Sequence, residues 1–392
     1  MRRRRALAAL GGLAVAAAGC SLGGDTAQIA CVWSGRELSA FKSALRQVGA
    51  DATTFTVGDD IGPLLRSQVA PAMLPDVAIV PQPGLVTDPL SRLQPLTSPD
   101  PQRWSRLVTR DGRVYGIWFK VSHKSLVWHR RFGATPPRDW PGWVGWCQDL
   151  AAKGQHPLSL GAADGWVLTD WFENVLLGID VDTYRRLSTG GDDWAHPSVW
   201  QALVRLGRLW QISGLFPGGP RRALITQFEE SVLDVFARGQ ALTVAGADSA
   251  WPVIRYFGRY PAAWSAFPGS HARRPLVGGD VAVLLKDSEA GQQLISRLLS
   301  EAADVWARDG GLLPLRHPPR DAPEALRAPE LWNDVQSGEF DLSDRLTGRL
   351  AAGEGKGTWR IFKDFFRQVA VDRLTPEQAA DTAIVSLTGQ RA

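Results

Sequence analysis

Tryptophans stand beside acidic and other hydrogen-bonding side chains at several places in this chain. The groups are Trp33 with Ser34, Arg36 and Glu37, Trp166 with Asp170 and Trp171, Asp248 with Trp251, and Trp359 with Arg360. An indole ring packs on the apolar CH faces of a sugar, whereas the hydroxyls at the edge of that sugar need convergent polar partners. These residue types therefore indicate non-covalent binding of a polyhydroxylated ligand. Other tryptophans are expected in the core, among them Trp128, Trp143, Trp210 and Trp306.

Patterns that would indicate catalysis or metal binding are scarce. The six histidines form no H-E-x-x-H pattern, there is no G-x-S-x-G segment, and the glycine-rich run 353–357 lacks the spacing of a phosphate-binding loop. A carboxylate pair for glycoside hydrolysis, Glu37 with Asp170 or Asp280, is an alternative that the sequence leaves open. We therefore expect a binding protein without cofactor or metal, and keep a glycan-active enzyme as the alternative.

The elements that must position these residues begin with alternating strands and helices. They are a strand over 28–33, a helix that ends at Gly49, a strand over 53–57, a helix over 61–69 and a strand over 76–80. Ser34 and Glu37 fit a capping box at the start of the first helix. This β-α-β-α-β order predicts a mostly parallel sheet with both faces covered. Ligands bind beyond the carboxyl ends of such strands, here 33–37 and 81–85.

Later segments alternate less regularly. Helices are predicted over 141–153, 167–177, 197–212, 225–238 and from about 287 to 311, and strands over 240–244 and 277–285. About 370 residues follow the N-terminal segment, which exceeds one typical core, so we expect two domains.

The N-terminal segment has the three-part build of a secretory signal. Arg2 to Arg5 precede an apolar run over 6–18, which is shorter than the about 20 residues that span a bilayer, and small residues precede Cys20. This arrangement resembles the lipobox of bacterial lipoproteins. We therefore expect residues 1–19 to be a signal peptide, Cys20 to be lipidated and residues 20–27 to be a tether. The general secretory and twin-arginine routes both stay open.

The formal net charge of +4 comes from 44 basic and 40 acidic residues, and Arg2 to Arg5 account for the difference. Without them the chain is close to neutral and lacks the basic surplus that a phosphate backbone or an anionic membrane attracts. Nucleic acid is therefore not an expected partner. Besides Cys20 the cysteines are Cys31 and Cys147, and we expect two separately buried thiols rather than a disulfide.

Segments in a fixed order along nearly the whole chain resemble those of a known family. They are VWSGRE (32–37), VYGI with LVWH (114–117 and 126–129), PPRDW (136–140), FARGQALT (236–243), and GGD (278–280) with the helix after it. This order is similar to that of the bacterial extracellular solute-binding proteins of carbohydrate ABC importers, the family 1 solute-binding lipoproteins. Each segment alone is a weak signal, but their order is specific.

The resemblance implies an α/β fold of the two-lobed periplasmic-binding-protein-like kind, with two α/β domains joined by hinge crossings and the ligand cleft between them. It implies a first lobe of 28–120 plus 277–328 and a second lobe of 121–276 plus 329–392. The polar segment from Lys120 to Lys124, inside an otherwise apolar run, would cross between the lobes at the cleft floor and face water and ligand. Residues 277–282 would be the return crossing.

The resemblance also implies the function and its partners. The chain would be exported, anchored through the lipid on Cys20 to the outer face of the cytoplasmic membrane, and monomeric. It would capture a sugar or oligosaccharide and deliver it to the permease subunits of an ABC importer; a lipoprotein of the same fold that serves a sensor is the alternative. The expected ligand-binding residues are Trp33, Ser34, Glu37, Gln82, Ser122, Trp166, Asp170, Trp171, Trp251, Asp280 and Trp359. At Gln82 the chain departs from the acidic pair that many relatives carry nearby.

Overall fold

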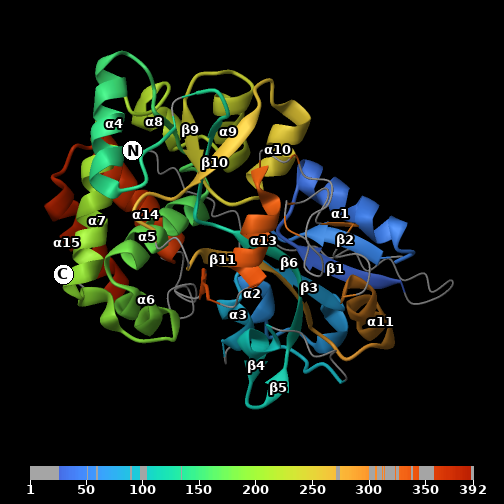
Figure 1. Cartoon of the computed structure of the whole chain (residues 1–392). Helices are drawn as coiled ribbons and strands as arrows, with labels where there is room; N and C mark the ends of the chain where they lie inside the picture. The colour runs from blue at the N-terminus through green and yellow to red at the C-terminus, as the bar shows by residue number, and fades with distance from the viewer. Residues whose placement is uncertain are drawn as a thin grey trace, which may run out of the picture.

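The structure of the chain is a computed structural model (Figure 1). It describes residues 26–50, 52–58, 61–88, 91–97, 104–133, 135–270, 274–299, 305–306, 311, 313, 323, 326–336, 339–343 and 357–389. The predicted signal peptide and Cys20 lie outside the described residues.

The larger of the sheets has six strands. They are β1 (Ala27–Cys31), β2 (Ala52–Thr56), β3 (Val77–Val80), β6 (Gly116–His123), β11 (Leu276–Leu284) and β12 (Asp341–Leu342). β1 is parallel to both β2 and β3, which confirms the parallel sheet predicted for the N-terminal part. β11 runs antiparallel to β3 on one side and to β6 on the other. We call this sheet and the helices on its faces the first lobe.

Alternating apolar residues explain why both faces of this sheet are covered. In β3, Val77 and Ile79 join one apolar cluster, whereas Ala78 and Val80 join the other. Successive side chains of a strand point to opposite faces, so a run that is apolar throughout needs cover on each face. The helices associated with this sheet are α1 (Gly35–Gln47), α2 (Gly62–Leu65), α3 (Gly84–Thr87), α11 (Glu289–Arg297) and α13 (Ala328–Gln336). A hairpin of β4 (Thr109–Arg110) and β5 (Arg113–Val114) projects from it.

The smaller sheet has four strands in the order β10-β7-β9-β8. They are β7 (Leu126–Arg130), β8 (Leu158–Ser159), β9 (Thr243–Ala245) and β10 (Ala262–Ala266). Helices surround it, as Figure 1 shows. They are α4 (Trp140–Ala152), α5 (Gly165–Ile179), α6 (Val181–Ser188), α7 (Pro197–Trp210), α8 (Gly219–Ala223), α9 (Phe228–Phe236), α10 (Ala250–Phe257), α14 (Thr358–Phe366) and α15 (Pro376–Thr388). We call this sheet with these helices the second lobe.

The crossing from the first lobe to the second is shorter than predicted. β6 stays paired with β11 as far as His123, and β7 begins the smaller sheet at Leu126, so only Lys124 and Ser125 connect the two sheets. The return occurs before Leu276, because the whole of β11 lies in the larger sheet. The prediction that 277–282 form the return crossing is therefore wrong. The sequence shows an apolar strand there but not where the chain crosses between the lobes.

One part of the predicted division of the chain also differs from the observed pairing. Residues from 329 onward were expected in the second lobe, yet β12 pairs with β11 in the larger sheet. A strand of two residues carries too little pattern to be recognised in sequence. The exact lobe boundaries remain a proposal.

The two cysteines that the structure describes are free, as predicted. Cys31 and Cys147 are both fully buried. Burial raises the pKa of Cys31 to about 11 and that of Cys147 to about 12, so both are inert thiols. Within the described residues, no helix has both the length and the apolar character needed to cross a membrane.

Candidate ligand-binding site

Lys120 lies among carboxylates near the end of β6. Its side chain is 7% exposed, and its Nζ atom is 3.4 Å from a carboxylate oxygen of Glu37 and 3.4 Å from one of Asp280. Burial lowers the pKa of Lys120, but the charges of Asp280, Glu37 and Asp248 outweigh burial and raise the pKa above its ordinary value. Lys120 is therefore a permanent cation. It is buried, whereas the sequence predicted that it would be exposed to water.

A β-bulge in β6 decides where Lys120 points. Lys120 pairs with Asp280, while the next pair along the ladder is Trp118 with Val281, so one residue of β6 is extra. Trp118 and Val121 both join the larger apolar cluster, although regular alternation would put residues three apart on opposite faces. The bulge thus turns Lys120 towards Glu37 and the ring of Trp306.

The start of α1 supplies Glu37. Gly35 has a φ of +51°, a left-handed conformation that glycine adopts without strain, and the chain turns there from β1 into the helix. Ser34 is the residue before α1, but its side chain makes no capping hydrogen bond, and the Glu37 carboxylate accepts from Lys120 instead. The predicted capping box is therefore wrong. Burial raises the pKa of Glu37, and the neighbouring Lys120 partly opposes that rise.

Asp248 brings the second lobe to the same cluster. It is fully buried in the turn after β9 and accepts a hydrogen bond of 2.8 Å from the backbone N–H of His123. A Cβ atom added to Gly311 would lie 3.5 Å from Asp248 Oδ2 and 3.8 Å from Lys120 Cε, so the backbone at Gly311 passes beside both residues. Burial lowers the pKa of His123 to about 3, which keeps that imidazole neutral.

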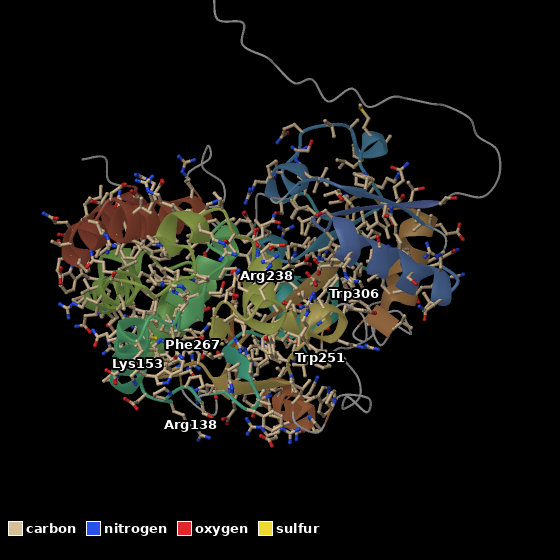
Figure 2. All side chains as sticks on the ribbon, turned by 90° about the horizontal axis from the view of Figure 1, so that it is seen from above. Arg138, Lys153, Arg238, Trp251, Phe267 and Trp306 are labelled. Carbon is tan, nitrogen blue, oxygen red and sulfur yellow. The ribbon has the colours of Figure 1, made fainter. Side chains whose placement is uncertain are left out.

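Aromatic rings pack behind this cluster on the side of the first lobe. Trp33 packs 4.8 Å from Trp306 and 4.8 Å from Phe41 between ring centroids, and Lys120 Nζ lies 5.6 Å from the Trp306 ring. Trp306 is labelled in Figure 2. Trp33 is 5% exposed and Trp306 is fully buried, as was predicted for Trp306. The structure therefore places Trp33 mainly in the first-lobe core, directly behind the charged residues.

Lys124 forms a second buried cluster at the crossing between the lobes. Its Nζ atom donates to Asp170 Oδ1 of α5 at 2.9 Å and to Ser343 Oγ, just after β12, at 3.0 Å. Ser343 also donates to Glu173 Oε2 at 2.7 Å. Asn174 donates to the carbonyl of Lys124 at 3.1 Å. The lysine thus ties the crossing segment to helix α5 of the second lobe and to the end of β12 in the first.

Trp166 and Trp359 lie beside this second cluster. Lys124 Nζ is 5.9 Å from the Trp166 ring, which also packs edge-on against Phe228 at 5.0 Å. A Cβ atom on Gly165 would lie 2.5 Å from Trp359 Cβ, so the first turns of α5 and α14 touch there. Both tryptophans are partly buried, and the Trp359 indole nitrogen has no hydrogen-bond partner among the described residues.

The remaining predicted site residues are spread over both lobes. Gln82 is buried beyond the end of β3, and its Oε1 atom has no partner among the described residues; Ser122 is buried in β6 opposite Gly278. Trp251 is partly buried at the start of α10. Trp171 is 1% exposed and packs 5.0 Å from Phe267, which Figure 2 labels, and it therefore lies in the second-lobe core.

Some residues of these clusters were not among the expected ligand-binding residues. They are Lys120, Lys124, Glu173, Asp248 and Ser343, although Asp248 was noted beside Trp251 and the two lysines were expected at the cleft floor. The signal for the two lysines was present, since polar residues interrupt an apolar strand there. Nothing in the sequence pairs Glu173 or Ser343 with Lys124, because these residues meet only through the fold.

The arrangement provides fixed hydrogen-bond donors and acceptors with indole rings nearby. Such groups can exchange their partners for the hydroxyls of a neutral ligand, and the excess of carboxylates over lysines disfavours an anionic one. In the described part of the chain, no three histidine, cysteine, aspartate or glutamate side chains are grouped so that they could hold a metal ion.

Comparison with known proteins gives two curated relatives. The osmoprotective compounds-binding protein GgtB of Synechocystis sp. is 28% identical over 336 residues, which cover 75% of this chain and 77% of GgtB. The alpha-glucosides-binding periplasmic protein AglE of Rhizobium meliloti is 25% identical over 391 residues, which cover 88% of this chain and 84% of AglE. Both are binding proteins by name. No protein-family model matches the chain.

Solved structures share the fold. The bacterial solute receptor AcbH, which has an exclusive preference for β-D-galactopyranose, superposes with a TM-score of 0.72 at 14% identity and covers 93% of this chain and 98% of its own. Maltose-bound MalE3 of T. maritima gives 0.70 at 17% identity and covers 93% of this chain and 100% of its own. The chain therefore has the two-lobed α/β fold of solute-binding proteins, and its predicted resemblance to the carbohydrate-binding proteins of ABC importers is confirmed.

Proposed function

We propose that this chain is an exported solute-binding protein that holds a sugar, an oligosaccharide or a related neutral polyol between its two lobes and delivers it to an ABC importer. The observation that carries the proposal is the cluster around Lys120, where Glu37 and Asp280 of the first lobe and Asp248 of the second surround one buried cation. Groups from both lobes can thus contact one ligand. The names of the relatives support a polyhydroxylated ligand.

Binding without catalysis fits the state of the carboxylates. The pairs that a glycosidase mechanism would need draw on Glu37, Asp170 and Asp280, and each of these residues is bound to a lysine. A general acid and a nucleophile need a carboxyl group that is free to transfer a proton or attack the sugar. We therefore propose no enzymatic activity, and unchanged oligosaccharides after long incubation with the protein would support this.

We further propose that a lipid attaches the protein to the membrane. Lipidation of Cys20 would anchor the protein to the outer face of the cytoplasmic membrane, where a monomer can meet permease subunits. A lipoprotein that presents the same ligand to a sensor is the second candidate. Loss of sugar uptake on deletion of the gene would favour the importer, whereas unchanged uptake with altered gene expression would favour the sensor.

A thermal-shift screen tests the proposal. The chain beginning after Cys20 is heated with a panel of monosaccharides, oligosaccharides, glycosylated polyols, peptides and amino acids. A ligand at 100 times its dissociation constant stabilises the folded state by about 2.7 kcal/mol, which is readily seen. We expect stabilisation by a neutral sugar or glycosylated polyol. A response confined to peptides or amino acids would contradict the proposal.

A further inference from the structure

Arg36 reaches across from the first lobe to the second. It is the second residue of α1, and its guanidinium carbon lies 4.0 Å from the ring centroid of Tyr256 and 5.0 Å from that of Phe257. Both rings end α10, a helix that follows the smaller sheet. Figure 1 shows α10 next to α1, although the two helices belong to different lobes. A cation over an aromatic face at these distances is attracted to the ring.

Charge on the second lobe adds to this contact. Glu229, in the first turn of α9, is raised in pKa mainly by burial, while the positive charge of Arg36 acts in the opposite direction. Asp164 and Glu230 add negative charge around Glu229. The positive charge of Arg36 is therefore felt by a carboxyl group of the second lobe, in addition to its contact with two rings.

The rings are not needed to fold α10. This helix buries Ala250, Val253 and Ile254 against its own lobe, whereas Tyr256 and Phe257 are 48% and 46% exposed. Large apolar side chains left on the surface at one helix end are available for contacts outside their own lobe. Here the ring centroid of Tyr256 is 4.0 Å from the guanidinium carbon of Arg36, nearer than the 5.7 Å to that of Arg255 on its own helix.

The turn at Gly35 links this contact to the candidate site. Arg36 and Glu37 follow Gly35 in the first turn of α1, and successive helix residues point about 100° apart, so Arg36 meets α10 and Glu37 meets Lys120. A force that holds Arg36 against α10 also holds the start of α1, and with it the Glu37 carboxylate, over the site.

We propose that Arg36, Tyr256 and Phe257 form a clasp between the lobes that keeps the site closed over its ligand and positions Glu37. The clasp rests on the proposed function, since a clasp matters only if something is held between the lobes. Its residues are positioning residues: they need not touch the ligand. Because the clasp forms once the lobes have met, it governs release of the ligand more than its capture.

Release kinetics test the clasp. With the sugar found in the thermal-shift screen, stopped-flow tryptophan fluorescence gives the association and release rates of wild type, Arg36→Ala, Tyr256→Ala and the double variant. An exposed cation–π contact predicts release about two- to five-fold faster in each single variant, with association nearly unchanged. The double variant should release no faster than the faster single one, because both changes remove the same contact.

Conservative and matched variants distinguish loss of the clasp contact from unrelated effects of a substitution. Arg36→Lys and Tyr256→Phe keep a cation and a ring and should release at close to the wild-type rate. Arg46→Ala removes the same charge from the exposed last turn of α1 and should change nothing. Unchanged release in Arg36→Ala, or effects that add in the double variant, would overturn the clasp.

A second measurement needs no ligand. Spin labels on Ser39→Cys in α1 and Arg221→Cys in α8 report the distance between the lobes, and Cys31 and Cys147 are too buried to be labelled. Arg36→Ala should shift the ligand-free distance distribution towards longer values. If no sugar stabilises the protein, the proposed function fails; if the distribution is the same with and without Arg36, the clasp fails.

Discussion

Pairing of buried charges explains how the apolar strand β6 accommodates Lys120 and the crossing after it accommodates Lys124. An unpaired ion in a protein interior costs several kcal/mol, and a paired one is tolerated only when other groups satisfy it. Lys120 meets that condition through Glu37 and Asp280, and Lys124 through Asp170 and Ser343. The polar residues at this point are therefore stabilised by ion pairs and hydrogen bonds with their partners and not by exposure to water.

Replacing Lys124 by methionine should destabilise the protein. The change Lys124→Met keeps an unbranched side chain of nearly the same length but leaves Asp170 without its 2.9 Å ion pair in a buried site. We expect a loss of about 3 to 5 kcal/mol in the free energy of unfolding, measured with urea by tryptophan fluorescence. The exposed Lys153→Met is the control and should stay within about 0.5 kcal/mol of wild type. A loss below about 1 kcal/mol for Lys124→Met would mean that the pair contributes little.

Several residues of the two buried clusters were expected from the sequence as candidates, but the pairs that they form were not. Glu37 and Asp170 were expected as carboxylates near tryptophans and Asp280 from the family resemblance, and each proves to be bound to a lysine. The sequence separation is 83 residues for Lys120 with Glu37 and 219 for Lys124 with Ser343. Contacts at such separations depend on the register of several strands, which local patterns do not contain.

At the scale of elements, the pairing of β6 with β11 holds the crossing and the first cluster together. Gly278 and Gly279 lie opposite Ser122 and Val121, where the two backbones come close. A Cβ atom on Gly279 would lie 2.2 Å from the carbonyl oxygen of Lys120, which no flexible side chain can relieve. Gly279 is thus required by the approach of the strands.

Gly279→Ala should therefore be costly. Forcing a Cβ atom against backbone must move one strand, and we expect the free energy of unfolding to fall by at least about 2 kcal/mol. Gly145→Ala, inside α4 with nothing within 4 Å of its added Cβ, should instead gain about 0.5 to 1 kcal/mol. Urea unfolding of both variants measures the contrast. Equal stabilities would show that β6 and β11 have room that the structure does not indicate.

Asp76 ties β1 to the start of α11 and makes the first lobe sensitive to acid. It accepts from the backbone N–H of Gln28 at 2.8 Å and from Ser288, and Lys286 lies 3.3 Å away. Burial raises the pKa of Asp76, but these hydrogen bonds and Lys286 outweigh it and leave the pKa below its ordinary value. A carboxylate with a lowered pKa adds stability above its unfolded pKa of about 3.9, and this stability is lost as pH falls further.

Asp76→Asn should be less stable than wild type at pH 7 and should lose less additional stability between pH 4 and pH 2. Urea unfolding at several pH values measures both effects. Asp287→Asn changes a neighbouring exposed carboxylate whose contact with Gln292 is long, at 3.4 Å, and serves as the control. An unchanged acid dependence in Asp76→Asn would assign the acid sensitivity to other carboxylates.

The elements show where sequence patterns suffice. β1, β2 and β3 with α1 were predicted because each follows a local pattern of apolar residues, and their parallel pairing follows from that order. Helix α11 begins at Glu289, close to the start predicted at about 287, and the hydroxyl of the preceding Ser288 accepts from the N–H of Gly291. The return crossing predicted over 277–282 was wrong, because the pairing of β11 with β3 and β6 depends on distant segments that local patterns do not contain.

At the scale of the whole molecule, the fold brings Lys120 of the first lobe and Asp248 of the second into one cluster, while Arg36 contacts α10 on the surface. Two α/β lobes that meet along such charged residues can enclose a ligand when they rotate about the short crossing at Lys124 and Ser125. Capture, holding and delivery would then depend on the same motion.

The predicted anchor also belongs to this scale. Cys20→Ser should leave an exported protein that partitions into the aqueous phase on detergent separation, because acyl chains supply most of the membrane affinity of such a protein. Wild type should remain in the detergent phase. Retention of the variant in the detergent phase would assign the anchoring to the apolar run over 6–18.

Hydrogen–deuterium exchange with and without the sugar tests the central claim most directly. The site draws on three segments from both lobes: the start of α1, the end of β6, and the turn that contains Asp248. Saturating sugar should slow amide exchange in all three together and leave α15 unchanged. Protection confined to one lobe, or located away from Lys120, would contradict a ligand held between the lobes.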